Sequence, residues 1–163
     1  MSATLPSPRP AQTDAHRHAL AARTAKRDAA LAIGIDAAFI SDLVDRFYAA
    51  VRDDALLGPI FAERIADWPV HLGRMKAFWS SVLHNSGTYS GSPMRKHLAI
   101  PGLDRTHFDR WLTLFRATLA DLARDPAAAP HVEARARMIA TSLLNAIVIN
   151  RDGLAAAQGL EDF

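Results

Sequence analysis

The sequence predicts an all-α protein, and three observations support that fold class. Apolar residues recur at intervals of three and four in successive segments, as they do on the buried face of a helix. Pro, Gly, Asp or Ser separates these segments at positions typical of helix ends. No segment alternates apolar and polar residues in the manner of a half-buried strand. With 163 residues, 50% of them hydrophobic, the chain is long enough to bury one core.

The composition excludes several classes of protein. Because the chain has no cysteine, it has no disulfide framework, no cysteine zinc site, no iron–sulfur cluster and no haem attached through cysteine. Lys and Arg number 19 against 17 Asp and Glu, and a net charge of +2 does not indicate nucleic-acid binding. No apolar run approaches the roughly 18 residues of a membrane span. Since an apolar secretory core is also missing, we expect a soluble cytoplasmic protein.

The N-terminal part is expected to form an extension outside the main domain. Residues 1–13 contain three prolines and little that is bulky, so we expect a disordered lead. Residues 14–33 are strong helix formers, with Asp14 as a candidate N-cap and Gly34 as a candidate stop. The expected divisions are an extension at 1–34, a globular domain at 35–150 and a C-terminal tail at 151–163.

The first helix of the main domain is expected to follow Asp36, a candidate N-cap. Its apolar residues have helical spacing: Phe39, Leu43, Val44, Phe47, Tyr48 and Val51. Acidic residues at 53–54 and the Gly-Pro pair at 58–59 end it. Ile60 and Phe61 follow directly, where a loop would ordinarily be polar, so we expect both to be buried.

A second helix is expected with Asp67 as a possible cap and Pro69 in its first turn. Its apolar stripe comprises His71, Met75, Phe78, Trp79 and Val82. A loop rich in Gly, Ser and Asn follows at 84–91. The next segment has Ser92 as cap and Pro93 as first residue, and a Pro-Gly pair ends it after two turns at most.

Two further helices complete the domain. The first is expected to begin at Thr106 and to end before residues 124–130. Its apolar face comprises Phe108, Trp111, Leu112, Phe115, Leu119 and Leu122. The last helix precedes the polar tail, and its apolar face comprises Val132, Ala136, Ile139, Leu143, Ala146 and Ile147.

Seven histidines are the available metal ligands, and two of them have distinctive surroundings. His71 lies on an apolar stripe, where a histidine is more often a core residue than a ligand. His97 lies in the two-turn segment, which has too little apolar surface to dock strongly unaided. A metal bond would anchor that segment, although spacing alone favours a structural role. The others are expected to be solvated or to lie at the surface or at helix caps: His16, His18, His84, His107 and His131.

Two aromatic residues carry polar atoms on the expected inward faces of separate helices. Tyr48 offers a hydroxyl and Trp111 an indole N–H, and each needs a partner when it is buried. Both could be core residues with local backbone partners. They could also converge on a polar ligand in a mostly apolar cavity.

Four runs together resemble the group III truncated haemoglobins. They are LVDRFYAAVRDDALLGPIF, HLGRMKAFWSSVL, TYSGSPMRKHLAI and HFDRWLTLFRATLADL, and the resemblance spans about residues 39–149. The Gly-Gly motifs of the first two groups of truncated globins are absent, which is consistent with the third group. The resemblance implies a two-over-two helical sandwich enclosing a non-covalent haem b with its iron.

The resemblance also implies a role for particular residues. His97 matches the proximal iron ligand, and Tyr48, His71 and Trp111 match residues on the opposite side of the haem. The positions implied to pack on the porphyrin or line its pocket are Phe61, Met75, Phe78 and Trp79. Arg95 and Lys96 are expected to reach the propionates because of their charge and their position beside His97. No partner for the second imidazole nitrogen of His97 is evident in the sequence.

The function implied is reversible binding of dioxygen, and of other diatomic gases such as nitric oxide. The alternative is a haem enzyme on the same scaffold, a nitric oxide dioxygenase or a peroxidase that depends on an external reductase. A carboxylate beside the proximal imidazole would favour peroxidase chemistry, whereas a backbone carbonyl would suit gas binding. A third hypothesis is a cofactor-free helical interaction module. It does not explain why Ile60 and Phe61 are apolar or how the short His97 segment docks.

Overall fold

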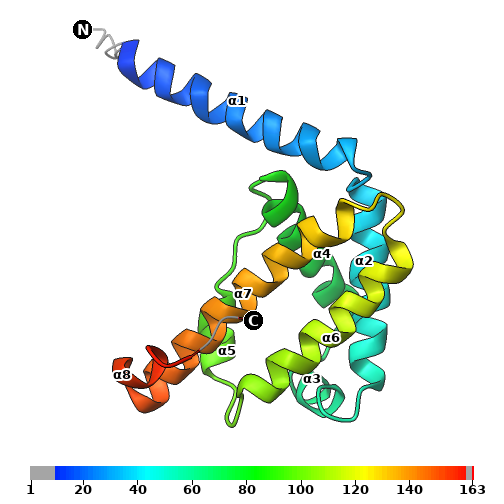
Figure 1. Cartoon of the computed structure of the whole chain (residues 1–163), viewed down its shortest axis with the longest axis vertical. Helices are drawn as coiled ribbons and strands as arrows, with labels where there is room; N and C mark the ends of the chain where they lie inside the picture. Colours follow the sequence, from blue (N-terminus) through cyan, green and yellow to red (C-terminus); the bar gives the residue numbers. More distant parts are fainter. Residues whose placement is uncertain (1–9, 161–162) are drawn as a thin grey trace, which may run out of the picture.

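The computed structural model describes residues 10–160 and residue 163, and these residues form helices and no strands (Figure 1). The all-α prediction is therefore confirmed for this part of the chain. The helices are α1 (Pro10–Ala32), α2 (Ala37–Asp53), α3 (Gly58–Arg64), α4 (Trp68–His84), α5 (Pro93–Leu98), α6 (Arg105–Leu122), α7 (Ala128–Asp152) and α8 (Leu154–Ala157). None of them is long and apolar enough to cross a membrane.

Four long helices form the body of the molecule. Helix α2 packs against both α4 and α6, and α6 packs in turn against α7. The short helix α3 lies against α2, and α5 lies beside α7 (Figure 1). The result is two pairs of helices, one on the other, with two short helices at their margin.

Acidic caps begin three of these helices. Asp36 accepts a hydrogen bond from Phe39 N at 2.7 Å at the start of α2. Asp67 accepts one from Val70 N at 3.0 Å at the start of α4, so both expected caps are confirmed. The third helix was expected to begin at Thr106, but the cap is Asp104 and α6 begins at residue 105. The carboxylate of Asp104 accepts from Thr106 N at 3.0 Å and satisfies a free amide of the first turn.

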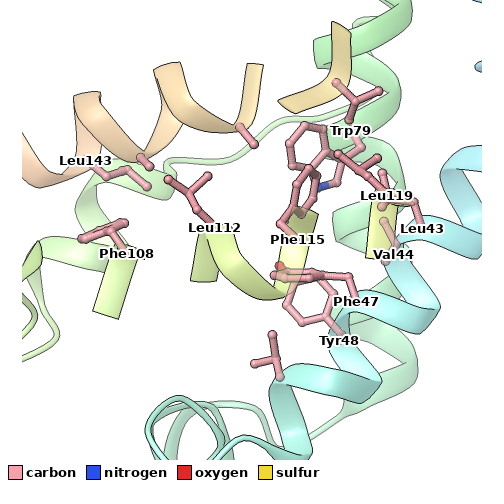
Figure 2. Packing of buried hydrophobic residues seen from close by; sticks show 14 of the residues in the cluster. Leu43, Val44, Phe47, Tyr48, Trp79, Phe108, Leu112, Phe115, Leu119 and Leu143 are labelled. Atoms are coloured by element: carbon pink, nitrogen blue, oxygen red, sulfur yellow. The ribbon is translucent and has the colours of Figure 1, made fainter. Parts of the chain in front are cut away.

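The core is built mainly of aromatic and branched residues from α2, α4, α6 and α7 (Figure 2). Trp79 of α4 stacks on Phe115 of α6, with ring centroids 5.0 Å apart. Phe47 of α2 meets Phe115 edge to face at 5.1 Å. Ile60 and Phe61 lie in α3, half-buried and packed against this core, so the expected burial is confirmed in part.

Helix α1 projects away from the other helices and is exposed over most of its length (Figure 1). It begins at Pro10 rather than after the expected cap Asp14, and residues 1–9 of the expected lead lie outside the described residues. It ends at Ala32, where Gly34 adopts a φ of +80° that favours glycine, as expected of a stop. The boundaries of the extension, domain and tail remain a prediction.

Two histidines outside the candidate site stabilise the fold through hydrogen bonds: His84 at the end of α4 and His107 at the start of α6. His84 was expected at the surface or a cap, but it is buried at the end of α4, and its ring Nε2 lies 2.6 Å from the backbone carbonyl of Ile35. This bond ties α4 to the turn between α1 and α2. His107 takes part in the capping box of α6, as expected.

Candidate functional site

His97 lies in the short helix α5, which Pro93 begins. Its Nδ1 atom lies 2.7 Å from the backbone carbonyl oxygen of Pro93, four residues earlier. A carbonyl oxygen can only accept a hydrogen bond, so Nδ1 carries the proton and Nε2 keeps its lone pair. That nitrogen makes no hydrogen bond to any residue of the described chain. His97 therefore presents a free basic nitrogen in a fixed tautomer.

The surroundings of His97 favour its neutral form. Burial of the ring lowers the pKa of His97, and the hydrogen bond to Pro93 opposes that effect only in part. The ring of Phe108, from α6, lies 6.5 Å away at an interplanar angle of 30°. A neutral imidazole with one free nitrogen is a good ligand for iron.

Four rings from three helices form a second feature, which we term the aromatic cluster: Tyr48, Phe61, Trp68 and His71. Tyr48 of α2 meets the ring of His71 edge to face at 5.2 Å and 90°. Phe61 of α3 meets Tyr48 at 5.8 Å and His71 at 6.4 Å. Trp68 meets the ring of His71 at 5.6 Å and 87°. His71 is therefore surrounded by aromatic faces and edges.

Polar atoms in this cluster lack partners. The Nε2 atom of His71 is buried without a hydrogen bond. The hydroxyl of Tyr48 makes no hydrogen bond to another described residue, although Tyr48 is only 5% exposed. Burial, with a smaller effect of Tyr89, raises the pKa of Tyr48, so its hydroxyl stays protonated and able to donate. A buried polar atom without a partner is costly, so Nε2 of His71 is available to a polar partner that the described chain does not supply.

Helix α5 and the aromatic cluster are close enough to interact electrostatically. Burial lowers the pKa of His71, and the positive charges of Lys96 and Arg74 lower it further. Lys96 is the neighbour of His97 in sequence, so its charge acts on His71 across the space between α5 and α4. His71 is consequently a neutral imidazole at neutral pH.

Trp111 supplies a second unpaired donor from α6. Its ring stacks on Phe115 at 5.1 Å with an interplanar angle of 11°. It also meets Phe47 edge to face at 5.3 Å, and Phe47 meets Tyr48 in the same way at 5.0 Å. Figure 2 shows Phe47 beside Tyr48 and Phe115. Phe47 thus contacts the rings of both Tyr48 and Trp111 edge to face. The indole N–H of Trp111 makes no hydrogen bond within the described chain.

The remaining expected site residues lie in three environments. Met75 and Phe78 are half-buried on α4 and pack against the core. Trp79 is 2% exposed, and its ring contacts with Phe78 and Phe115 place it in the core stack. Arg95 and Lys96 are exposed on α5.

Trp68 joins the aromatic cluster although it lies outside the apolar stripe expected on this helix, which begins at His71. It precedes His71 by three residues and shares its face. The carbonyl of Pro93 was also unforeseen as the partner of His97. The spacing of four residues within a short helix was the available signal.

Comparisons with known proteins agree with this fold. The model of the bacterial-like globin family matches residues 31–145. The chain is 34% identical over 110 residues to a group 3 truncated haemoglobin of Campylobacter jejuni, an alignment that covers 65% of this chain and 86% of the relative. The crystal structure of a group III truncated haemoglobin from Campylobacter jejuni matches with a TM-score of 0.66 and 33% identity, covering 69% of this chain and 91% of the other.

The helices and the site thus define a globin of the truncated class. The chain belongs to the bacterial-like globin family, and the resemblance to group III truncated haemoglobins and the two-over-two globin fold are both confirmed. Family membership implies a haem iron as the cofactor and diatomic gases as its ligands.

The residues present fit a haem. A free imidazole nitrogen at His97 suits an iron ligand, and the buried Nε2 of His71 has no partner within the described chain and can take a polar one. The aromatic faces of the cluster provide apolar surface for a flat macrocycle. The exposed cations Arg95 and Lys96 on α5 suit its acidic propionates.

Proposed function

We propose that this protein binds haem b non-covalently through Nε2 of His97 and reversibly binds dioxygen and other diatomic gases such as nitric oxide. One observation carries the proposal: Nδ1 of His97 donates to a backbone carbonyl, that of Pro93, and not to a carboxylate. A carbonyl fixes the ring orientation without drawing away its proton, so the imidazole stays a neutral ligand of moderate basicity. That is the proximal environment expected for gas binding.

A haem held by His97 would supply an iron centre able to bind a small gas molecule. The hydroxyl of Tyr48 and the indole N–H of Trp111 are the proposed donors to that gas. Both atoms lack a protein partner, and Phe47 holds both rings in place. With haem bound, these two donors would stabilise a gas ligand that carries partial negative charge and would slow its release.

The remaining residues hold and shield the cofactor in this proposal. Phe61 packs on the porphyrin. Met75 and Phe78, backed by Trp79 in the core, form an apolar wall that limits water. Arg95 and Lys96 bind the propionates. His71, neutral and unpaired at Nε2, contributes a further polar contact on the gas side.

Spectra of the reconstituted protein test this function. We expect a Soret band after haem is supplied, distinct ferrous, oxy and carbonyl spectra, and slow oxygen release. Loss of the oxy form within seconds of its formation, without recovery of the ferrous spectrum, would contradict reversible binding. Sustained consumption of nitric oxide or peroxide with an external reductase would instead assign the enzymatic alternative.

A further inference from the structure

Trp68 is the first residue of α4 and belongs to the aromatic cluster. It is half-buried, and its ring lies nearly parallel to that of Phe61, with centroids 6.4 Å apart and an interplanar angle of 23°. Its edge contact with His71, at 5.6 Å, links it to the neutral imidazole. Trp68 therefore covers two residues of the site and keeps part of its own ring exposed.

Arg52 covers Trp68 in turn. The guanidinium carbon of Arg52 lies 4.6 Å from the centre of the Trp68 ring. Arg52 is itself exposed, in the last turn of α2. A cation above an indole face is attracted by the ring electrons, and the attraction is weak enough at an exposed site to break and re-form.

The backbone around this pair is tightly constrained. A side-chain carbon added to Gly58 would lie 2.7 Å from the carbonyl oxygen of Arg52, so α3 begins in direct contact with the end of α2. The carboxylate of Asp67 caps α4 and sets Trp68 at its first position. Since the backbone is held on both sides, movement at this point falls to the side chains of Arg52 and Trp68.

We propose that Arg52 and Trp68 form a clasp over the outer side of the aromatic cluster, through which gases enter and leave. Arg52 holds the indole against Phe61 and His71, and release of this contact opens the path and frees His71. Trp68 is thus a positioning residue that acts through His71, and Arg52 acts through Trp68. The inference rests on the proposed function, because it concerns access to the haem.

The contact itself can be measured without haem. The three tryptophans are labelled with 5-fluorotryptophan, and the Trp68 resonance is assigned in the ¹⁹F NMR spectrum by its loss in Trp68→Phe. In the apo-protein, Arg52→Gln is expected to shift this resonance and raise its exposure to solvent. Arg46→Gln is the matched control, since Arg46 is an exposed arginine of the same helix. Equal spectra for Arg52→Gln and wild type would overturn the clasp.

Carbon monoxide rebinding after flash photolysis measures access in the haem-loaded protein. Loss of one exposed cation–π contact is expected to raise the bimolecular association rate about two- to fivefold in Arg52→Gln. Trp68→Ala is expected to raise it further, and Arg46→Gln to leave it unchanged. The Soret band of each variant reports an intact site. Normal haem uptake with unchanged rates in both clasp variants would overturn this inference alone, whereas failure of the wild type to take up haem would overturn the proposed function.

Discussion

The imidazole of His97 donates a hydrogen bond from Nδ1 to the backbone carbonyl oxygen of Pro93, at 2.7 Å and within the same short helix. The acceptor is part of the backbone and has no titratable proton. The orientation and tautomer of the ring are therefore set by the fold of α5 itself.

We predict that the iron–histidine stretching band of the ferrous protein will lie in the range of carbonyl-bonded imidazoles and will not move between about pH 6 and about pH 9. Resonance Raman spectroscopy measures this band. A band in the higher range of carboxylate-bonded imidazoles would show that another group replaces Pro93 when haem is bound.

Removal of the Tyr48 hydroxyl should speed oxygen release. Tyr48→Phe keeps the ring that contacts Phe47 and His71 and removes only the donor. A hydrogen bond to a charged acceptor contributes about 1.5 kcal/mol or more, so release should be roughly tenfold faster. Stopped-flow mixing of the oxy protein with carbon monoxide gives the rate.

Trp111→Phe should act in the same direction as Tyr48→Phe, because the indole N–H is the second proposed donor. The double variant tests whether the two donors act on one ligand. If they do, the combined effect on the release rate should differ from the product of the single effects. A release rate equal to that of wild type in Trp111→Phe would show that its N–H does not reach the gas.

Asp54 should stabilise the fold at neutral pH. Its carboxylate accepts hydrogen bonds from Leu57 N at 2.9 Å and Leu56 N at 3.0 Å, and from Arg110 Nε at 2.6 Å. Burial alone would raise the pKa of Asp54, but the amide of Leu57, the guanidinium of Arg110 and the amide of Leu56 outweigh it and hold the pKa below its ordinary value. Asp54→Ala should therefore lower the free energy of unfolding by about 1–3 kcal/mol at neutral pH.

The pH dependence of that loss follows from the direction of the shift. A lowered folded-state pKa contributes stability above the unfolded pKa of about 3.9, and this contribution fades as the pH falls through the folded value. The difference in free energy of unfolding between wild type and Asp54→Ala should thus become smaller below about pH 4. Urea unfolding at several pH values measures it, with the exposed neighbour variant Asp53→Ala as control. A difference in free energy of unfolding that grew as the pH fell would contradict the lowered pKa of Asp54.

Most of α1 should be dispensable for haem binding. Its N-terminal length is exposed, whereas Ala30 near its C-terminal end and Ile35 in the turn that follows are fully buried. Deletion of residues 1–27 should leave the Soret band and the melting temperature unchanged. Deletion of residues 1–35 removes both buried side chains and the carbonyl that bonds His84, and should lower the free energy of unfolding by about 2–4 kcal/mol. A large loss from the shorter deletion would mean that α1 belongs to the domain.

The helices could be predicted because their signals are local. The caps Asp36 and Asp67 and the apolar spacing that follows them lie within a few residues of each other, and the structure confirms both starts. The start at Thr106 was misplaced because Asp104 offers a stronger cap two residues earlier. Asp14 failed as a cap because α1 already begins at Pro10.

The candidate site was predicted less completely because its contacts are long-range. His84 bonds a carbonyl 49 residues away, which no local pattern reveals. Trp68 joins the aromatic cluster only because α2, α3 and α4 converge. Placing Tyr48 beside His71 needed the family resemblance, and their edge contact at 5.2 Å is visible only in the folded chain.

Haem titration of the apo-protein, followed at the Soret band, tests the central claim most directly. The wild type should bind one haem per chain tightly, His97→Ala should lose tight binding, and added imidazole should restore a ligated spectrum to His97→Gly. His107→Ala is the matched control, because His107 caps α6 outside the site, and should bind haem as the wild type does. Haem binding by His97→Ala at wild-type affinity, with an unchanged spectrum, would contradict the account.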